Sequence, residues 1–519
     1  MPPKDYDEAL EVIAAKVSEI DALSRDLRIL RQENELLKRG RFGRSSERMD
    51  PGQLGLFAGK AGAPALRDEA GKPDLGRKSK SKKAGHGRQA LPDALPREII
   101  ELDVPEADRC CSDCGKPMRL IGQDVTERGH IVPAKVVVNQ YRIKKYGCPD
   151  GHEVKSANAP EGLVAGTKYE ASVYASVVTS KYADHLPLNR LEGIFKRSGL
   201  HLPRQTMWDM LLRVDELVAQ PILTQMHTEL LREPVLHADE TPVTTRLEDG
   251  KGTKTGYVWC WRSLEEPGPT KVLVDFRVSR GRDGPLDFLG SWSGTLILDG
   301  YAGYDEVIRQ NDIRRAGCWA HARRKVKDAY DTGAKEAAAL LRTIQLLFRL
   351  ERSAKQAAAK HANPSAALLS QRERIRGRRS RRVLEILFAQ AAELQDSRSV
   401  LPKSQLGKAL RYLERQRSAL EAFLDDPRLP IHNNDAERDL RQLAVGRRNW
   451  LVFGSQRGGD VACRLYSLAL SCKHAEIDPE AYLLDVIGRA PTTKPSAMGE
   501  LTPWAWAARE AEGSLVETA

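Results

Sequence analysis

Hydrophobic and polar residues follow a helical repeat near the start of the chain. Residues 7–39 contain neither Gly nor Pro, and from Ile20 onward their apolar side chains are three and four positions apart. The heptad that fits this spacing has Ile20, Leu27 and Asn34 at a and Leu23, Leu30 and Leu37 at d. It predicts a short parallel coiled coil that makes a homodimer. The reason is that the buried side-chain amide of an Asn at position a is best satisfied by hydrogen bonds to the same Asn of the partner helix. A lone amphipathic helix on the protein's own core is the alternative, since three heptads are the minimum.

Continuous apolar runs bounded by turn residues predict buried strands in the middle of the chain. The run 233–243 (EPVLHADETPV) brings Asp239 and Glu240 to its carboxyl end, and the run 295–298 ends at Asp299. Ligands collect at the carboxyl ends of strands in open α/β sheets, so we expect the acids to share one site. Two further strands are expected between them, at 255–262 and 271–277.

Helical periodicity covers most of the remaining chain. Helices are expected at 172–182, 189–198, 203–218, 336–359, 403–424, 461–475 and 479–487. The first three carry several basic residues and allow a helix-turn-helix that docks on DNA. Ordinary helix packing is slightly favoured, because helical hairpins are common in α-rich proteins. The residues after Ala490 are expected to form a short aromatic hook, with Trp504 and Trp506 laid on the core.

The amino-acid composition indicates which class of partner the protein binds. The 519 residues carry a net charge of +11 and are 41% hydrophobic, which allows several domains and a sizeable core. The basic balance favours nucleic acid as partner, although charge alone equally fits a merely basic enzyme. With no apolar leader and no apolar run of about 18 residues, neither secretion nor a membrane span is expected. We expect a cytoplasmic, nucleoid-associated, bacterial-type protein.

Four potential zinc ligands occur in two close pairs. Cys111 and Cys114 form a C-x2-C, and Cys148 and His152 form a C-x3-H, the ligand types of a closed structural Zn²⁺ site. A hairpin within 131–146 is expected to bring the pairs together. Cys110 is a competing ligand, and reduced thiols without metal are the alternative. The preceding residues 59–97 are rich in Gly, Ala, Pro and Lys and predict a linker.

A third acid can be added to Asp239 and Asp299 from the segment HNNDAERDLR (432–441), which is typical of the first turn of a helix. The residues alone leave Asp435, Glu437 and Asp439 open, and Asn434-x-x-Glu437 also fits a capping box. Three carboxylates without a counter-charge would repel one another and raise one another's pKa. Mg²⁺, which prefers hard oxygen ligands, removes that conflict and leaves positions open for a substrate phosphate.

Five motifs then resemble a known family. HADETPV (237–243), DGYAGY (299–304), GCWAHARR (317–324), NNDAERDLR (433–441) and GRRNWLVFG (446–454) occur in the order seen in insertion-sequence transposases of the IS66 family. The resemblance runs from the first heptads to Trp506. It implies a DDE transposase with an RNase H-like core, a leucine-zipper segment and a zinc finger. One departure is that the family's second C-x2-C is replaced here by Cys148 and His152.

The resemblance also assigns the site. Asp239, Asp299 and Glu437 are the implied catalytic residues, holding two Mg²⁺ (or Mn²⁺) ions about 4 Å apart. The supporting residues are His321, Asn433, Asn434 and Glu240. DNA contacts are expected from Arg323, Arg324, Lys325, Arg438, Arg441, Arg447 and Arg448. His321 as a buried structural histidine is the competing interpretation.

The expected fold is a multi-domain α+β chain in which a helical insertion interrupts an RNase H-like α/β catalytic core. The expected domains are a coiled coil (1–50), a basic linker (51–97), a zinc module (98–160), a helical DNA-binding segment (161–225), the first part of the core (226–334), the insertion (335–428), the rest of the core (429–490) and a tail (491–519). The expected function is cleavage of an element's 3′ ends and their transfer into target DNA. Its partners would be double-stranded terminal repeats, target DNA and small accessory proteins. The alternatives are an RNase H-like nuclease or resolvase, and a zinc-containing regulator without catalysis.

Overall fold

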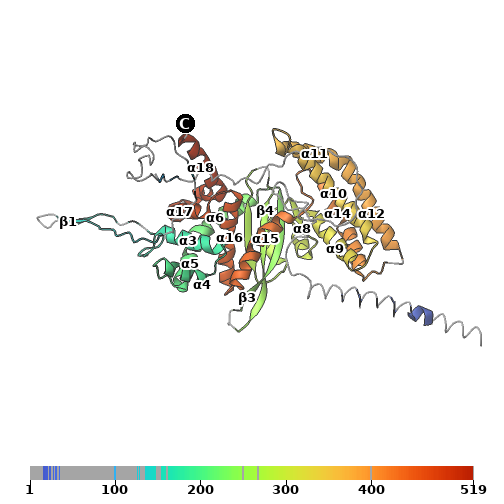
Figure 1. The fold of residues 1–519 in the computed structure, drawn as a ribbon, viewed down its shortest axis with the longest axis horizontal. Helices are drawn as coiled ribbons and strands as arrows, with labels where there is room; N and C mark the ends of the chain where they lie inside the picture. The colour runs from blue at the N-terminus through green and yellow to red at the C-terminus, as the bar shows by residue number, and fades with distance from the viewer. Residues whose placement is uncertain are drawn as a thin grey trace, which may run out of the picture. The chain divides into compact units, whose positions relative to one another are not determined.

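The computed structural model describes residues 162–517, apart from 248–250, 266–267 and 398–399 (Figure 1). Before residue 162 it describes 16–20, 23–24, 27, 30–31, 34, 97, 99–100, 125–126, 128, 135–147, 154–158 and 160. The chain divides into residues 59–139 and a unit that contains all the rest. The predicted zinc ligands Cys111, Cys114, Cys148 and His152 lie outside the described residues.

The described residues of the predicted coiled coil, from 16 to 34, are all helical. Four apolar heptad positions among them, Ile20, Leu23, Leu27 and Leu30, are each at least half exposed. Further along the chain, β1 (Lys145–Gly147) pairs antiparallel with β2 (Val154–Ser156). The predicted hairpin lies within residues 131–146, closer to the N-terminus than the observed pair of strands. The described residues 135–144 form no strand.

A five-stranded mixed sheet organises the larger unit. In chain order its strands are β3 (Val235–Arg246), β4 (Thr253–Ser263), β5 (Val272–Arg277), β6 (Thr295–Leu298) and β7 (Arg314–Gly317). Their order across the sheet is β5-β4-β3-β6-β7, with β3, β4 and β5 antiparallel and β3, β6 and β7 parallel. Four strands were predicted, whereas β7 was missed because its sequence, RRAG, is short and has no apolar run.

The predicted end of the β3 strand is wrong. Asp239 lies in the middle of β3, which pairs with β4 through Asp239↔Cys260 and on to Arg246↔Thr253. Only the parallel pairing with β6 ends before Asp239, at His237↔Ile297. The strand continues because its antiparallel neighbour continues to supply hydrogen bonds.

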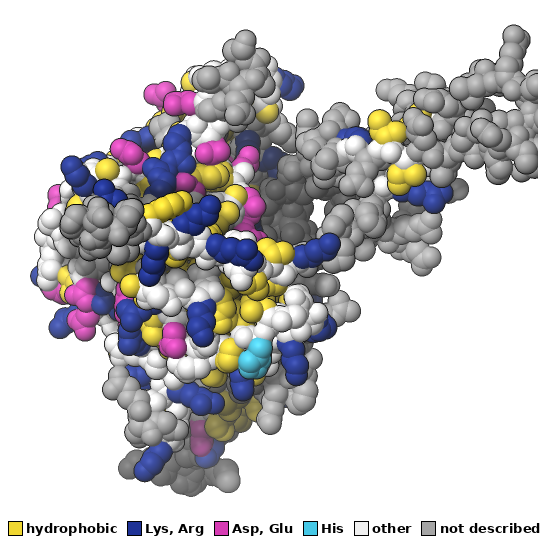
Figure 2. Space-filling view, turned by 90° about the vertical axis from the view of Figure 1, so that its left-hand side faces the viewer, with side chains coloured by type: hydrophobic (Ala, Val, Ile, Leu, Met, Phe, Trp, Pro, Cys, Tyr) yellow, Lys and Arg dark blue, Asp and Glu magenta, His cyan; other side chains and the backbone are white. Residues whose placement is uncertain are grey.

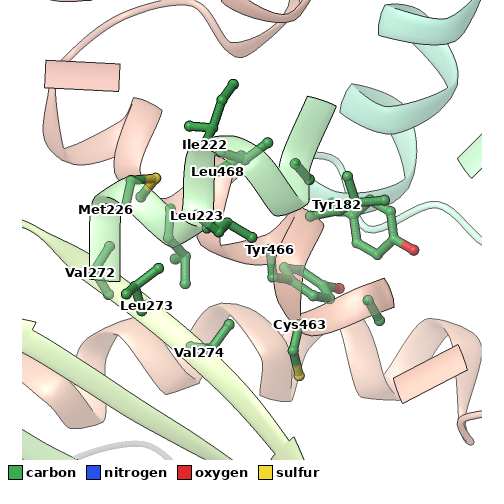
Figure 3. Packing of buried hydrophobic residues seen from close by; sticks show 14 of the residues in the cluster. Tyr182, Ile222, Leu223, Met226, Val272, Leu273, Val274, Cys463, Tyr466 and Leu468 are labelled. Carbon is green, nitrogen blue, oxygen red and sulfur yellow. The ribbon is translucent and has the colours of Figure 1, made fainter. Parts of the chain in front are cut away.

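Six helices that precede β7 share one hydrophobic core with the sheet. They are α3 (Ala171–Tyr182), α4 (Leu188–Arg197), α5 (Arg204–Val214), α6 (Gln220–Leu230), α7 (Asp283–Leu289) and α8 (Asp305–Gln310). The first three agree closely with the predicted helices. Figure 3 shows Leu223 and Met226 of α6 beside Val272 and Leu273 of β5. Because α3 to α6 share one hydrophobic core with the sheet, they pack as part of the same body.

Helix α16 (Gln456–His474) closes the open edge of the sheet at β5. The Ser467 hydroxyl accepts from Val274 N at 2.9 Å, and the Ser471 hydroxyl donates to Val272 O at 3.1 Å. These bonds occupy strand groups that would otherwise form an unpaired edge. Helices α17 (Pro479–Arg489) and α18 (Pro503–Glu517) follow. The predicted aromatic hook is thus the start of a helix, on which Trp506 Nε1 donates to Asp485.

The insertion between β7 and the third acid forms a second helical cluster, on the other side of the sheet (Figure 1). Its helices are α10 (Ala337–Ala358), α11 (Pro364–Ile375), α12 (Arg381–Asp396), α13 (Gln405–Arg415) and α14 (Arg417–Glu421), packed beside α9 (Trp319–Asp331). Shorter helical turns occur at 215–219, 302–304, 376–380, 422–424, 490–492 and 495–501. The helix predicted at 403–424 is broken at Gln416. The chain then returns to the sheet as α15 (Asn434–Trp450).

A buried arginine holds the end of the insertion in place. Arg376 is fully buried, and its Nε and Nη2 donate to the carboxylate of Glu351 at 2.7 and 2.8 Å. It also donates to the carbonyls of Phe423 and Leu429, at 2.8 and 2.9 Å. One guanidinium therefore joins α10 to the loop that leads back to α15.

Candidate active site

Asp239 on β3 and Asp299, the residue that follows β6, occupy matching positions beside the parallel pairing of these two strands. The pairing of β3 with β6 ends at His237↔Ile297, and each acid lies two residues further along its own segment. Side chains two residues apart on a strand point to the same face. The register therefore directs the Asp239 carboxylate to the face of the sheet that carries His237, and Asp299 lies at the end of β6 beside it.

The pKa of the Asp239 carboxyl is raised well above its ordinary value. Burial is the largest cause, followed by the charges of Glu240, Glu437 and Asp299. The charges of Asp299 and Glu437 both act on Asp239, so the three predicted acids lie in one region of the fold, although 198 positions separate the first from the last. Their clustering disfavours a full set of negative charges unless a cation is added.

Glu240 points to the opposite face, where it braces the loop after β6. Its carboxylate accepts from Arg280 Nε at 2.8 Å and from the Tyr304 hydroxyl at 2.9 Å. The Arg280 guanidinium lies 3.7 Å from the centroid of the Tyr301 ring. Tyr301 N donates in turn to Asp299 Oδ1 at 2.8 Å. Glu240 thus acts on the site through the loop that positions Asp299.

Glu437 comes from the first turn of α15 and faces two basic residues of α9. Its Oε1 lies 3.7 Å from His321 Nε2, and its Oε2 lies 3.7 Å from Arg324 Nη2. Glu437 Oε1 is buried and, among the described residues, has no hydrogen-bond partner. An unpaired carboxylate oxygen is costly to bury, so this atom is well suited to accept a cation. Burial, with the charge of Arg324, lowers the pKa of His321 and favours its neutral form.

The capping-box interpretation of Asn434 and Glu437 is wrong. The residue that precedes the helix is Asn433, and Asn434 is the first helical residue. Glu437 N donates to Asn433 O at 3.3 Å, while the Glu437 carboxylate faces α9. Its side chain is therefore not used to cap the helix.

Asn433 joins the start of α15 to β3. Its Nδ2 donates to Ala238 O at 2.7 Å, and its Oδ1 lies 2.8 Å from His237 Nδ1. Its backbone N donates to Cys318 Sγ at 3.2 Å, next to α9. Asn433 thus contacts Ala238, which precedes Asp239 on β3, and Cys318, which precedes α9. Asn434 is buried beside it.

The two acids flanking Glu437 have different surroundings. Asp439 accepts from Arg262 Nη1 at 3.1 Å, and its other oxygen lies 2.8 Å from His474 Nε2. Asp435 pairs with Arg438 at 3.1 Å. Both carboxylates lie within 3.1 Å of a basic group, whereas Glu437 is 3.7 Å from its two basic neighbours and its Oε1 has no hydrogen bond to the described residues.

The predicted DNA-contacting residues divide by environment. Arg447 Nη1 donates to Thr241 Oγ1 at 3.3 Å and to Pro242 O, so it braces β3. Lys325 Nζ lies 4.8 Å from the ring centroid of Tyr412. The exposed residues among them are Arg324, Lys325, Arg438 and Arg448, whereas Arg323 and Arg441 are partly buried.

The side of the molecule that carries α3, α4 and α5 is also rich in basic residues. Figure 2 shows Lys and Arg side chains spread over this side among fewer acidic side chains.

The residues present are chemically suited to divalent cations. Within the described residues, no three His, Cys, Asp or Glu side chains are close enough together to form a ready metal site. The donor types nevertheless fit, because the cluster contains three carboxylates and the unpaired Glu437 Oε1. Closure of these side chains around an ion would relieve the repulsion that raises the pKa of Asp239.

Comparison with known families agrees with this geometry. The family model described as "Transposase IS66 family" matches residues 166–461, more than half of the chain. The chain belongs to this family. Other models match parts of this IS66 transposase: a leucine-zipper model described as "Transposase C of IS166 homeodomain" at 29–100, "zinc-finger binding domain of transposase IS66" at 108–150, and "IS66 C-terminal element" at 467–504. They confirm the predicted order of zipper, zinc finger and catalytic core. The zinc-finger match includes three of the predicted ligands but ends before His152.

Similar proteins occur in Sinorhizobium fredii. "Uncharacterized protein y4jD" is 31% identical over 510 residues, which cover 94% of this chain and 97% of that protein. "Uncharacterized protein y4qI" is 32% identical over 447 residues, covering 82% and 78%. The IS66 transposase is therefore similar to these relatives over most of its length. In the described part of the chain, no helix is long and apolar enough to cross a membrane.

Sequence reasoning missed several residues around the acids. Arg280 and Tyr304 hold Glu240, while Arg262 and His474 hold Asp439. Tyr304 had a signal, since it ends the DGYAGY motif. Arg262 had a weaker one, as a charged residue at the end of a predicted buried strand. Arg280 and His474 had none, because their partners are distant in sequence.

Proposed function

We propose that Asp239, Asp299 and Glu437 form the catalytic site of this DNA transposase. The observation that carries the proposal is that the charges of Asp299 and Glu437 both act on the buried Asp239, while Glu437 Oε1 has no hydrogen bond to the described residues. We further propose that the sheet is the core of an RNase H-like fold. The order β5-β4-β3-β6-β7, with a three-stranded antiparallel part followed by two parallel strands, supports it. Asp239 and Asp299 would be the acids of its first and fourth strands.

The proposed reaction is metal-dependent phosphodiester cleavage followed by transesterification. Mg²⁺ or Mn²⁺, when bound by the three carboxylates, would stabilise charge on the attacking and leaving oxygens. In the first step water attacks the phosphorus at the element's end, and the bond to the 3′ oxygen breaks. In the second step the freed 3′ hydroxyl attacks a phosphorus of target DNA, and a target 3′ oxygen leaves. Neither step forms a covalent bond to the protein.

The surrounding residues would position these groups. Asn433 would hold Glu437 at a fixed distance from β3, and Glu240 would hold the loop of Asp299 through Arg280 and Tyr304. A neutral His321 beside Glu437 could hydrogen-bond a phosphate oxygen. Arg324 and Lys325, exposed on the same helix, would meet neighbouring phosphates.

The other parts of the chain would bring DNA and a second copy to this site. We propose dimerisation through residues 1–50, a tether at 51–97, and a structural Zn²⁺ module at 98–160 that recognises the element's ends. The helices at 161–225 and the insertion at 335–428 would flank the core segments 226–334 and 429–490, followed by the tail. Zinc measured in the purified protein, and its loss in Cys114→Ser, would test the module.

The catalytic proposal is tested with pre-cleaved and uncleaved duplexes made from the DNA that flanks the coding sequence. Asp239→Asn and Asp299→Asn should abolish cleavage and joining while end binding stays near wild type. Asp287→Asn, which changes an acid that pairs with Arg277 at the surface, is the matched control. Strand transfer retained in either catalytic variant would refute the assignment. Wild-type protein that cuts but never joins pre-cleaved ends would favour a nuclease.

A further inference from the structure

The chain leaves α15 through a strained turn centred on Leu451. Leu451 has φ 66° and ψ −51°, and Val452 N donates to Trp450 O at 2.8 Å. This is a γ-turn with positive φ, which residues with a side chain rarely adopt. The Leu451 side chain is 67% exposed. The large apolar side chain of Leu451 is therefore exposed to solvent at a position whose backbone conformation Gly would adopt more easily.

The neighbours of Leu451 fix this turn from both sides. The Trp450 and Phe453 rings stack with centroids 4.7 Å apart, and Trp450 Nε1 donates to the Tyr466 hydroxyl at 3.2 Å. Phe453 N donates to Thr244 O at 2.9 Å, which attaches the segment to the end of β3. Strain of this kind persists only where the surroundings impose it, and it is concentrated at functional sites.

One face of α15 leads from Glu437 to Leu451. Arg441, Val445 and Arg448 follow Glu437 by four, eight and eleven residues, a spacing that places them on the same side of a helix. Val445 and Arg448 are exposed, and Arg441 is partly exposed. No Asp or Glu occurs between positions 439 and 460. The face is therefore basic, and its far end is the exposed Leu451.

Two paths give the same distance between the turn and the acids. Leu451 is fourteen residues after Glu437, which is about 21 Å along an α-helix. Thr245, which bridges Phe453, is six residues after Asp239, which is about 20 Å along a strand. A length of about 20 Å equals about six base pairs of DNA.

We propose that Leu451 is a wedge that enters a base step of the element-end duplex while its scissile phosphate lies at the three acids. Apolar side chains of DNA-bending proteins partly unstack a step and kink the duplex. Arg441 and Arg448 lie between the wedge and Glu437, where they would meet the phosphates of the intervening base pairs. We choose the element-end duplex rather than target DNA as the duplex that Leu451 enters, because in the proposed reaction the element end is the first DNA to bind at the three acids. The inference rests on the proposed function.

The test places 2-aminopurine at successive positions of an element-end duplex, because this base fluoresces more strongly when it is unstacked. With wild-type protein and Ca²⁺ in place of Mg²⁺, we expect a rise at one step, about six base pairs from the scissile phosphate. Leu451→Ala should lose the rise and cut more slowly, by roughly tenfold to a hundredfold, the range for a misplaced reacting group. Leu484→Ala, which truncates another exposed leucine, should behave as wild type.

Leu451→Gly separates a wedge from a structural role. Gly adopts positive φ without strain, so this variant should melt at or above the temperature of wild type, yet lose the fluorescence rise. Wild-type protein that binds and cuts the duplex without a rise at any position would overturn the wedge and leave the catalytic proposal standing. A rise that survives in Leu451→Ala would overturn it too. Protein that never cuts or joins would defeat the catalytic proposal itself.

Discussion

Asn433 and His237 hold the strand of Asp239 and the helix of Glu437 together. Asn433 Nδ2 donates to Ala238 O, which directs Asn433 Oδ1 toward His237 Nδ1 at 2.8 Å. Burial lowers the pKa of His237 to about 4, so its ring is neutral near pH 7. An oxygen acceptor facing Nδ1 then requires that the proton be on Nδ1. The Asn433 amide orientation and the His237 tautomer therefore fix each other.

Asn433→Asp tests this connection with little change in volume. The variant keeps an acceptor for His237 but loses the donor to Ala238 O, and it adds a buried acid. We expect a loss of about 1–3 kcal/mol in the free energy of unfolding, the cost of an unsatisfied buried group. DNA cleavage should fall more than end binding, because Glu437 is displaced. Asn311→Asp, at a partly exposed residue whose Nδ2 donates to Gly290 O at 2.6 Å, provides the comparison; equal losses in the two variants would argue against a special role.

The three acids of α15 should give three different phenotypes. Glu437→Gln should remove cleavage and joining with the fold intact. Asp439→Asn should lower the free energy of unfolding by about 3–5 kcal/mol, because the buried Arg262 loses its carboxylate partner at 3.1 Å and keeps only the exposed Glu265 at 3.6 Å. Asp435→Asn should change stability little, since its partner Arg438 is half exposed. Chemical denaturation and a cleavage assay on the same preparations distinguish them. Wild-type cleavage by Glu437→Gln would exclude it as a ligand.

Replacing Arg376 should destabilise the insertion in a pH-dependent way. Burial opposes the charge of Glu351, but Arg376 and Arg372 hold the pKa of its carboxyl below the ordinary value. That stabilisation is present above the unfolded pKa and is lost as pH falls through the folded one. Arg376→Met should therefore cost about 3–5 kcal/mol near pH 7 and less in acid. Urea unfolding at several pH values measures this; a pH-independent deficit would contradict the ion-pair explanation.

Asp239→Asn should have opposite effects on stability with and without metal. Without divalent ions the variant should melt above wild type, because it removes one of the charges that repel one another around the buried Asp239. Mn²⁺ should raise the melting temperature of wild type and have little effect on the variant, because a ligand is lost. Thermal scans with and without Mn²⁺ provide the measurement. Equal Mn²⁺ shifts in both proteins would place the ion elsewhere.

The exposed heptad leucines should control the oligomeric state. Leu23 and Leu30 are each 62% exposed on helical residues, and a second copy would cover them. Leu23→Lys with Leu30→Lys should convert a dimer into a monomer, because buried like charges at d positions repel. Light scattering after gel filtration gives the mass. A Lys16→Gln variant, at an exposed residue that pairs with Glu19, should stay dimeric.

The sequence by itself determined the local elements and the approximate place of the site. Apolar runs fixed β4, β5 and β6, and helical periodicity fixed α3 to α5 and α10, because these patterns depend on neighbours within a few residues. The acid after β6 and the acid on β3 were also identifiable, since both follow apolar runs.

Only the tertiary structure decided how these parts are used. It placed Asp435 and Asp439 within 3.1 Å of basic groups, whereas Glu437 faces α9 at 3.7 Å with an Oε1 that has no hydrogen bond to the described residues. It continued β3 beyond Asp239 through pairing with β4, and it turned Leu451 outward. Each outcome depends on burial and on partners distant along the chain, and periodicity carries no information about such contacts.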